Sequence, residues 1–256
     1  MDYSKLKKQA RKNLQGNYGP LVISLLVFAA ISIVCTFIGK VTCSPLLEYA
    51  LYLIAESLLI MGFVKMIVKV SKKKKPVLDD LISETDSFLK YIVITIIVGL
   101  ILGILFLIAA IAFKSLISVL AHVNEINFIL ALVLILFGIL LVAAVIGVIV
   151  YLTVSFSQTL FILHDEKKLS ATQVLSKSFD MMYGYVLEYI ILTITFIGWM
   201  VLGIFTFGIL YLWLIPYMMV TYANFYKEVK KNYKAISGDK EPEKIFNDKD
   251  VKEEGE

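Results

Sequence analysis

The chain has 256 residues, of which 59% are hydrophobic and 18% charged, and its mean hydropathy is +0.83. Because only about half of the residues of a soluble domain are apolar, this composition excludes an ordinary water-soluble fold and predicts an integral membrane protein. The formal net charge of +4 does not indicate nucleic-acid binding, since the lysines lie between apolar runs, where the positive-inside bias places them.

The segment 1–19 is basic and amphipathic, and we expect it to form a short cytoplasmic helix that ends at Gly16 and the Gly19-Pro20 pair. The apolar runs after it are long enough to cross a bilayer, which takes about 20 helical residues. Residues 20–231 are predicted to form the transmembrane domain, and the charged tail 232–256 is expected to be disordered. The prediction is an all-α polytopic bundle of about six transmembrane helices with cytoplasmic interfacial helices, at residues 21–38, 46–70, 91–113, 128–150, 185–205 and 209–226.

Three local patterns refine this outline. The apolar run 128–163 would be about 54 Å long as one helix, so it must tilt or project inward. Ser170 and Gln173 fit a capping box that opens a helix at the inner interface. The segments NYGPLV at 17–22 and MYGYVL at 182–187 are similar, which suggests a threefold repeat of hairpins.

Basic residues predict the orientation. Of the 25 Lys and Arg residues, only Lys40 and Lys114 fall on one side of the membrane in this scheme. The others gather on the opposite side, which the positive-inside rule makes cytoplasmic. We therefore expect a multi-pass protein of the plasma membrane with both termini in the cytoplasm.

Glu56 is the most informative side chain, because it lies about 15 Å deep in the second span, where an ionised group is costly. Glu48, Tyr52 and Glu56 follow one another at helical spacing, so they are predicted to share a face that points into the bundle as an intramembrane polar site. Two interpretations stay open. Glu56 is either a proton or substrate site, or a protonated acid that is hydrogen-bonded to a neighbouring helix.

Other patterns predict little chemistry. The two histidines lack metal-ligand spacing, and the common catalytic motifs are absent, so we expect no enzyme activity, no metal and no cofactor. Cys35 and Cys43 are expected to be free thiols. Gly99 and Gly103 are assigned to packing between helices of this chain.

The stretch from Phe196 to Val229 carries an ordered series of aromatic and turn residues, namely Trp199, Gly208, Trp213, Pro216, Tyr217 and Tyr226. Together with the opening ARKNLQGNY, this series resembles the signature of a bacterial membrane protein family catalogued as domain of unknown function 975. The resemblance implies a multi-span protein of the bacterial cell membrane, mostly in low-GC Gram-positive organisms. It carries over no established activity, and it marks the six residues as structural.

Two functions remain open at this point. The leading hypothesis is a non-enzymatic scaffold or accessory protein that binds membrane lipid, another membrane protein or a second copy of itself, and no nucleic acid. The alternative is a transporter, or an export or immunity accessory, for a peptide or lipid-like solute, with Glu56 as its midplane coupling residue.

Overall fold

The computed structural model describes residues 1–82, 87–122 and 127–237. In these ranges the chain is all-α, as predicted, with ten α-helices, one 3-10 helix and no strand. The predicted tail from residue 232 is helical as far as Ser237, and its remainder lies outside the described residues. The elements are α1 (Tyr3–Leu14), α2 (Tyr18–Val41), α3 (Pro45–Ser71), η1 (Leu78–Leu81), α4 (Phe88–Ala121), α5 (Phe128–Ser155), α6 (Thr159–Asp165), α7 (Ala171–Met182), α8 (Val186–Ile194), α9 (Ile197–Phe205) and α10 (Tyr211–Ser237).

Five helical stretches are long and apolar enough to cross a membrane. They are α2, α3, α4, the stretch Phe128–Asp165 with α5 and α6, and the stretch Val186–Phe205 with α8 and α9. The chain is therefore a helical membrane protein. The sixth predicted span, 209–226, falls mainly in α10, which is not in this set, because its Trp, Tyr and Asn side chains and the charges from Lys227 onward lower its hydropathy.

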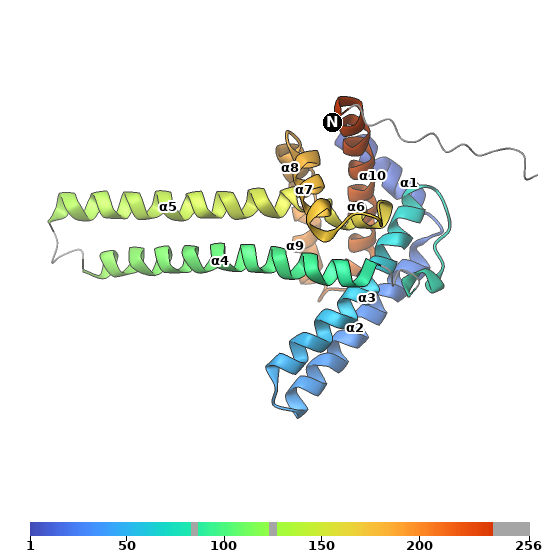
Figure 1. Ribbon diagram of the computed structural model, residues 1–256, viewed down its shortest axis with the longest axis horizontal. Helices are drawn as coiled ribbons and strands as arrows, with labels where there is room; N and C mark the ends of the chain where they lie inside the picture. The colour runs from blue at the N-terminus through green and yellow to red at the C-terminus, as the bar shows by residue number, and fades with distance from the viewer. Residues whose placement is uncertain (83–86, 123–126, 238–256) are drawn as a thin grey trace, which may run out of the picture.

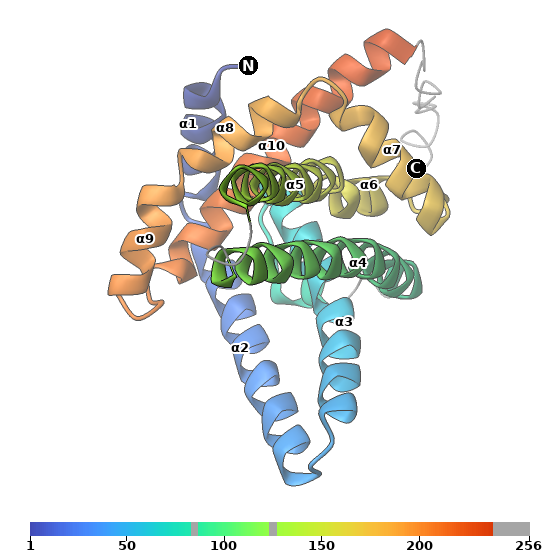
Figure 2. The ribbon, with the colours of Figure 1, turned by 90° about the vertical axis from the view of Figure 1, so that its left-hand side faces the viewer.

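Three helical hairpins leave a common base (Figures 1 and 2). The α2–α3 and α4–α5 hairpins project from the base in different directions, and α9 with α10 forms the third. The base contains α1, α6 and α7 together with the ends of α3 and α10. Its interior includes five fully buried side chains from five helices, Leu14, Met66, Ile162, Met182 and Phe225.

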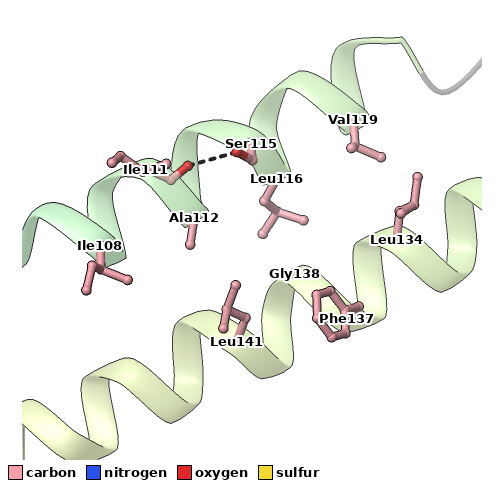
Figure 3. Close-up of a pocket in the computed structure, with 10 residues that line it drawn as sticks. All are labelled: Ile108, Ile111, Ala112, Ser115, Leu116, Val119, Leu134, Phe137, Gly138 and Leu141. Carbon is pink, nitrogen blue, oxygen red and sulfur yellow. Dashed lines mark hydrogen bonds between the residues drawn. The ribbon is translucent and has the colours of Figure 1, made fainter. Parts of the chain in front are cut away.

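The α4–α5 hairpin is mostly exposed along its length (Figure 1). Figure 3 shows an apolar cavity of about 410 Å³ between the two helices, towards the tip of the hairpin. Ser115 is the polar side chain that lines it, and its hydroxyl donates to the Ile111 carbonyl of the same helix at 3.0 Å. This cavity therefore offers apolar contact alone.

Gly99 and Gly103 of α4 face open space. A Cβ atom built at either position would have no neighbouring atom within 4 Å. The assignment of these two residues to packing within the chain was therefore wrong, and the close approaches in the described chain occur at other glycines. At Gly62 of α3, for example, a Cβ atom would lie 1.9 Å from the Leu81 carbonyl oxygen of η1.

The long apolar run 128–163 is broken into two helices. α5 ends at Ser155 and α6 begins at Thr159, so the chain turns into the base instead of continuing as one long helix. In the base, Phe161 stacks on Tyr226 of α10 with ring centroids 5.4 Å apart. The capping box that opens α7 is confirmed by two bonds, from the Gln173 amide to Ser170 Oγ at 3.3 Å and from the Ser170 amide to Gln173 Oε1 at 2.9 Å.

Helices α1 and α7 repeat each other. Each has 12 residues, and one constant residue offset relates their first residues, Tyr3 and Ala171, and their last, Leu14 and Met182. The same offset relates the four buried residues of α1 to four of the five in α7, and Leu175 is the fifth. The matched residues are Leu6, Ala10, Asn13 and Leu14 in α1 and Val174, Ser178, Met181 and Met182 in α7.

The same glycine turn follows both helices. The residue after each helix has φ −57°, with ψ 121° after α1 and 122° after α7. Gly16 and Gly184 then have φ values of 78° and 82°, a region that glycine adopts without steric cost. The next helix begins two residues later in each case.

This geometry corrects the register of the predicted repeat. The comparison of residues 17–22 with 182–187 paired Gly19 with Gly184, whereas the structure pairs Gly16 with Gly184. Gly19 and Pro20 lie in the first turn of α2 and do not break it, because proline is tolerated where the backbone amides have no helical partner.

The short elements α1, η1 and α7 each pack mainly against one of the hairpins, although α1 also contacts α3 and α7 also contacts α10. α1 lies along α10. η1 lies on α3, where the Asp80 carboxylate accepts from Lys69 Nζ at 2.6 Å. α7 contacts α4 and α5, and its Ser178 hydroxyl donates to the Ser155 carbonyl at 2.7 Å. The structure thus supports a repeat of α1 and α7, whereas the middle element η1 is a four-residue 3-10 helix and the threefold repeat stays a prediction.

Candidate functional site

The predicted polar face of α3 divides into two places. Tyr52 and Glu56 lie near Tyr91 of α4. Tyr52 is 43% exposed, so the prediction that this face points into the bundle is wrong for Tyr52. Glu56 is half-buried, and its carboxyl makes no hydrogen bond or ion pair within the described part of the chain. Glu48 lies instead against α2 near the hairpin tip, where a Cβ atom built at Gly39 would be 2.5 Å from the Glu48 Cβ. Glu48 thus has a packing partner that Glu56 does not share.

Three of the aromatic residues singled out in the sequence gather around one cavity. Trp199 of α9 and Trp213 and Tyr217 of α10 line a space of about 270 Å³, which we call the tryptophan cavity. Its full lining is Arg11, Tyr18, Trp199, Leu210, Trp213, Leu214 and Tyr217. Elements from the two ends of the chain, α1 and α2 at one end and α9 and α10 at the other, therefore build a single site.

The turn between α9 and α10 positions the two tryptophans. Phe207 and Gly208 both have positive φ, 51° and 86°, which reverses the chain tightly within the sequence FTFG. The Tyr211 hydroxyl donates to the Met200 carbonyl at 2.7 Å and ties the start of α10 to α9. Its ring fits there because residue 203 is a glycine, where a Cβ atom would lie 2.6 Å from Tyr211 Cζ. α10 then continues unbroken through Pro216.

Two cations of α1 lie over aromatic rings of this region. Arg11 Nε donates to the Tyr217 hydroxyl at 3.1 Å, and its guanidinium carbon is 5.7 Å from the Tyr217 ring centroid. One turn earlier, Lys7 Nζ lies 4.3 Å from the Phe196 ring centroid and donates to the Thr195 carbonyl at 3.4 Å. Burial, and then the Arg11 charge, lower the pKa of the Lys7 ammonium. Such contacts hold positive charge at the edge of an apolar surface.

Tyr226 belongs to a second polar site, in the base. Its hydroxyl donates to the Asp165 carboxylate at 3.1 Å, and Lys230 Nζ lies 3.0 Å from the same oxygen. Glu166 completes an ion-pair network with Lys177 at 2.7 Å and Lys230 at 3.3 Å. Burial raises the pKa of Glu166, but the two ammonium groups outweigh that effect and hold the pKa below its ordinary value. This network joins α6, α7 and α10 and has a structural role.

Sequence reasoning missed the positions of Arg11 and Tyr18 in the lining of the cavity and of Lys7 over Phe196. The basic residues of α1 were interpreted as a topology signal alone. The spacing of Lys7 and Arg11 puts both on one helical face, which a sequence shows. Only the folded chain shows that Arg11 on this face lines the same cavity as Trp199 and Trp213, which lie almost two hundred residues away in the sequence.

Residues 1–233 match a family described as a protein of unknown function, DUF975. The chain belongs to this family. The match confirms the resemblance noted in the sequence, and it includes every residue that lines the tryptophan cavity. No curated protein and no solved structure matches the chain. Membership in DUF975 therefore assigns the chain to a family but assigns it no activity.

Proposed function

We propose that this DUF975 member is a non-enzymatic scaffold or accessory protein of the bacterial cell membrane that binds a membrane lipid in the tryptophan cavity. The observation that carries the proposal is the cavity itself. Trp199 and Trp213 are 54% and 48% exposed, so large aromatic surfaces remain open beside a cationic rim. Tryptophan is favoured where lipid headgroups meet hydrocarbon, because its ring is apolar and its N–H is polar.

The basic side of the molecule is proposed to face the cytoplasm, together with both termini. The charge asymmetry supports this, since Lys40 and Lys114 alone fall on the opposite side. Cys43 offers a direct test, because it is a free, exposed thiol in the turn between α2 and α3, whereas Cys35 is buried. A membrane-impermeant maleimide should label intact cells, and Cys43→Ser should abolish the labelling. Labelling found only in inverted vesicles would reverse the orientation.

Lipid binding can be tested by native mass spectrometry of protein released from its own membrane. We expect phospholipid adducts on the wild type and reduced occupancy in Trp213→Ala. The matched control is Leu132→Ala, which alters a 47% exposed side chain on α5, away from the cavity. Equal adducts in all three proteins would contradict the proposal, whereas a stoichiometric protein partner would extend the accessory role.

A second candidate function is transport of a peptide or lipid-like solute. The half-buried Glu56 carboxyl without a hydrogen bond in the described chain favours it, because ionisable groups inside membrane spans often mark substrate or ion pathways. Glu56→Gln should then abolish copurification of a bound small molecule or peptide while the protein stays folded. An unchanged ligand profile in Glu56→Gln would remove this candidate.

A further inference from the structure

We infer that Lys7 and Arg11 make the tryptophan cavity selective for phospholipids whose headgroup carries a net negative charge. The inference rests on the proposed lipid binding and names the class of lipid. The two side chains lie one helical turn apart on the same face of α1. Arg11 lines the cavity, and Lys7 lies over Phe196, whose ring packs edge-on against Tyr217 of the lining with centroids 5.3 Å apart. A lipid whose acyl chain contacts the tryptophans would place its phosphate near this pair.

The charge of the pair is uncompensated. Neither Lys7 nor Arg11 forms an ion pair with a carboxylate of the described chain, and their near partners are aromatic rings, a hydroxyl and a carbonyl. In the base the pattern is opposite, since Lys69 is 2.6 Å from Asp80 and Lys177 is 2.7 Å from Glu166. An anionic ligand in the cavity would supply the negative charge that pairs with these two cations.

The geometry of Arg11 suits a phosphate. Its Nε–H is used by Tyr217, which fixes the orientation of the guanidinium plane. A guanidinium has five N–H donors in a rigid fork, so four remain for phosphate oxygens. The lipid phosphate and the guanidinium can then form the paired hydrogen bonds that such forks favour.

The repeat supplies a comparison within the molecule. The residues of α7 that correspond to Lys7 and Arg11 are Leu175 and Phe179, and they line a cavity of about 370 Å³ against α4 and the end of α5. Phe179 packs edge-on against Tyr151, with centroids 5.8 Å apart. The matching helices α1 and α7 thus each flank a cavity. Of these two cavities, the one beside α1 has a cation in its lining, Arg11, and the one beside α7 has none among the described residues.

The experiment uses the two tryptophans, because both line the cavity and the chain has no others. The full-length protein is reconstituted in vesicles that mix phosphatidylcholine and phosphatidylglycerol, with bromine on the acyl chains of one lipid or the other. Bromine quenches tryptophan fluorescence on contact, so the two series give the relative occupancy of the cavity. We expect the wild type to prefer phosphatidylglycerol about five- to tenfold, given the attraction of basic side chains for anionic lipid.

The double variant Lys7→Gln/Arg11→Gln should lose this preference and keep the quenching. The matched control is Lys8→Gln/Lys12→Gln, which removes the same charge from two exposed positions of the same helix and should keep the preference. A preference that survives in the first variant, or that falls equally in both, would overturn the inference. Quenching of the wild type by neither lipid would instead remove the proposed lipid binding itself. Thermal unfolding of each variant confirms that it is folded.

Discussion

Helices α1 and α7 have the same length, four matched buried positions and the same glycine turn, yet their flanking positions carry different chemistry. Lys7 and Arg11 of α1 correspond to Leu175 and Phe179 of α7. The cations lie over aromatic rings beside the tryptophan cavity, whereas Leu175 is buried and Phe179 packs against Tyr151. The buried stripe is therefore shared by the two helices, and the flank differs.

This difference has a physical explanation. A helix is positioned by the apolar stripe that it buries, and four matched positions supply that stripe in both helices. Arg11 and Phe179 lie at the edge of the stripe and are not buried, so a cation or a phenyl ring fits there without moving the backbone. One scaffold can then present an anion-binding edge in one copy and an apolar edge in the other.

The largest expected effect tests whether the two stripes are equivalent. Leu14→Ala and Met182→Ala remove corresponding side chains that are 0% exposed, and each should lower the free energy of unfolding by about 2–5 kcal/mol through lost burial and a residual cavity. Ile82→Ala, at a 74% exposed position, is the control and should change little. Chemical denaturation in detergent measures all three. If only one of the two variants lowered the free energy of unfolding by this amount, the buried stripes of α1 and α7 would not be equivalent.

A smaller effect is expected at the two turns. Gly16→Ala and Gly184→Ala force a side chain into left-handed backbone geometry, which costs about 1–2 kcal/mol each. Gly19→Ala provides the contrast, because Gly19 lies in the first turn of α2 and a Cβ atom there would meet no other atom within 4 Å. It should be neutral or slightly stabilising. Melting temperatures that rank Gly19→Ala below the other two variants would refute the corrected register.

The smallest effect distinguishes the two helices by pH. The Ser71 carbonyl accepts from Asn13 of α1 at 3.3 Å and from Lys227 at 2.6 Å, whereas the hydrogen bond that α7 makes from Ser178 to the Ser155 carbonyl involves no titrating group. Burial, and then the Lys72 charge, lower the pKa of Lys227 from 10.5 to about 8, although Asp165 opposes them.

The sign follows from proton linkage. Between pH 8 and 10.5 the folded chain releases the Lys227 proton before the unfolded chain does, so stability rises with pH over that window. Below pH 8 both states hold the proton and the penalty for burying the charge is present in full. Melting temperatures at pH 7 to 10 should rise more for the wild type than for Lys227→Met. Parallel profiles would show that the Lys227 charge is not buried enough to matter.

Local patterns predicted much of the fold. The apolar runs predicted the first five spans approximately, and the Ser170 to Gln173 spacing predicted a capping box that the structure confirms. These features depend on residues within a few positions of one another, so the sequence is enough. The register of the repeat was predicted wrongly because Gly16 and Gly19 are three residues apart, and only the backbone angles show which one forms the turn.

The sequence by itself determined the membrane class, most of the helices and the family, because hydropathy and helix signals act over one or two turns. Only the tertiary structure brought Arg11 to Trp199, Trp213 and Tyr217. It also left Glu56 without a hydrogen bond in the described chain and turned Gly99 and Gly103 outward. Those outcomes depend on which helix packs against which, and that choice is made by buried side chains from α1, α3, α6, α7 and α10 acting together.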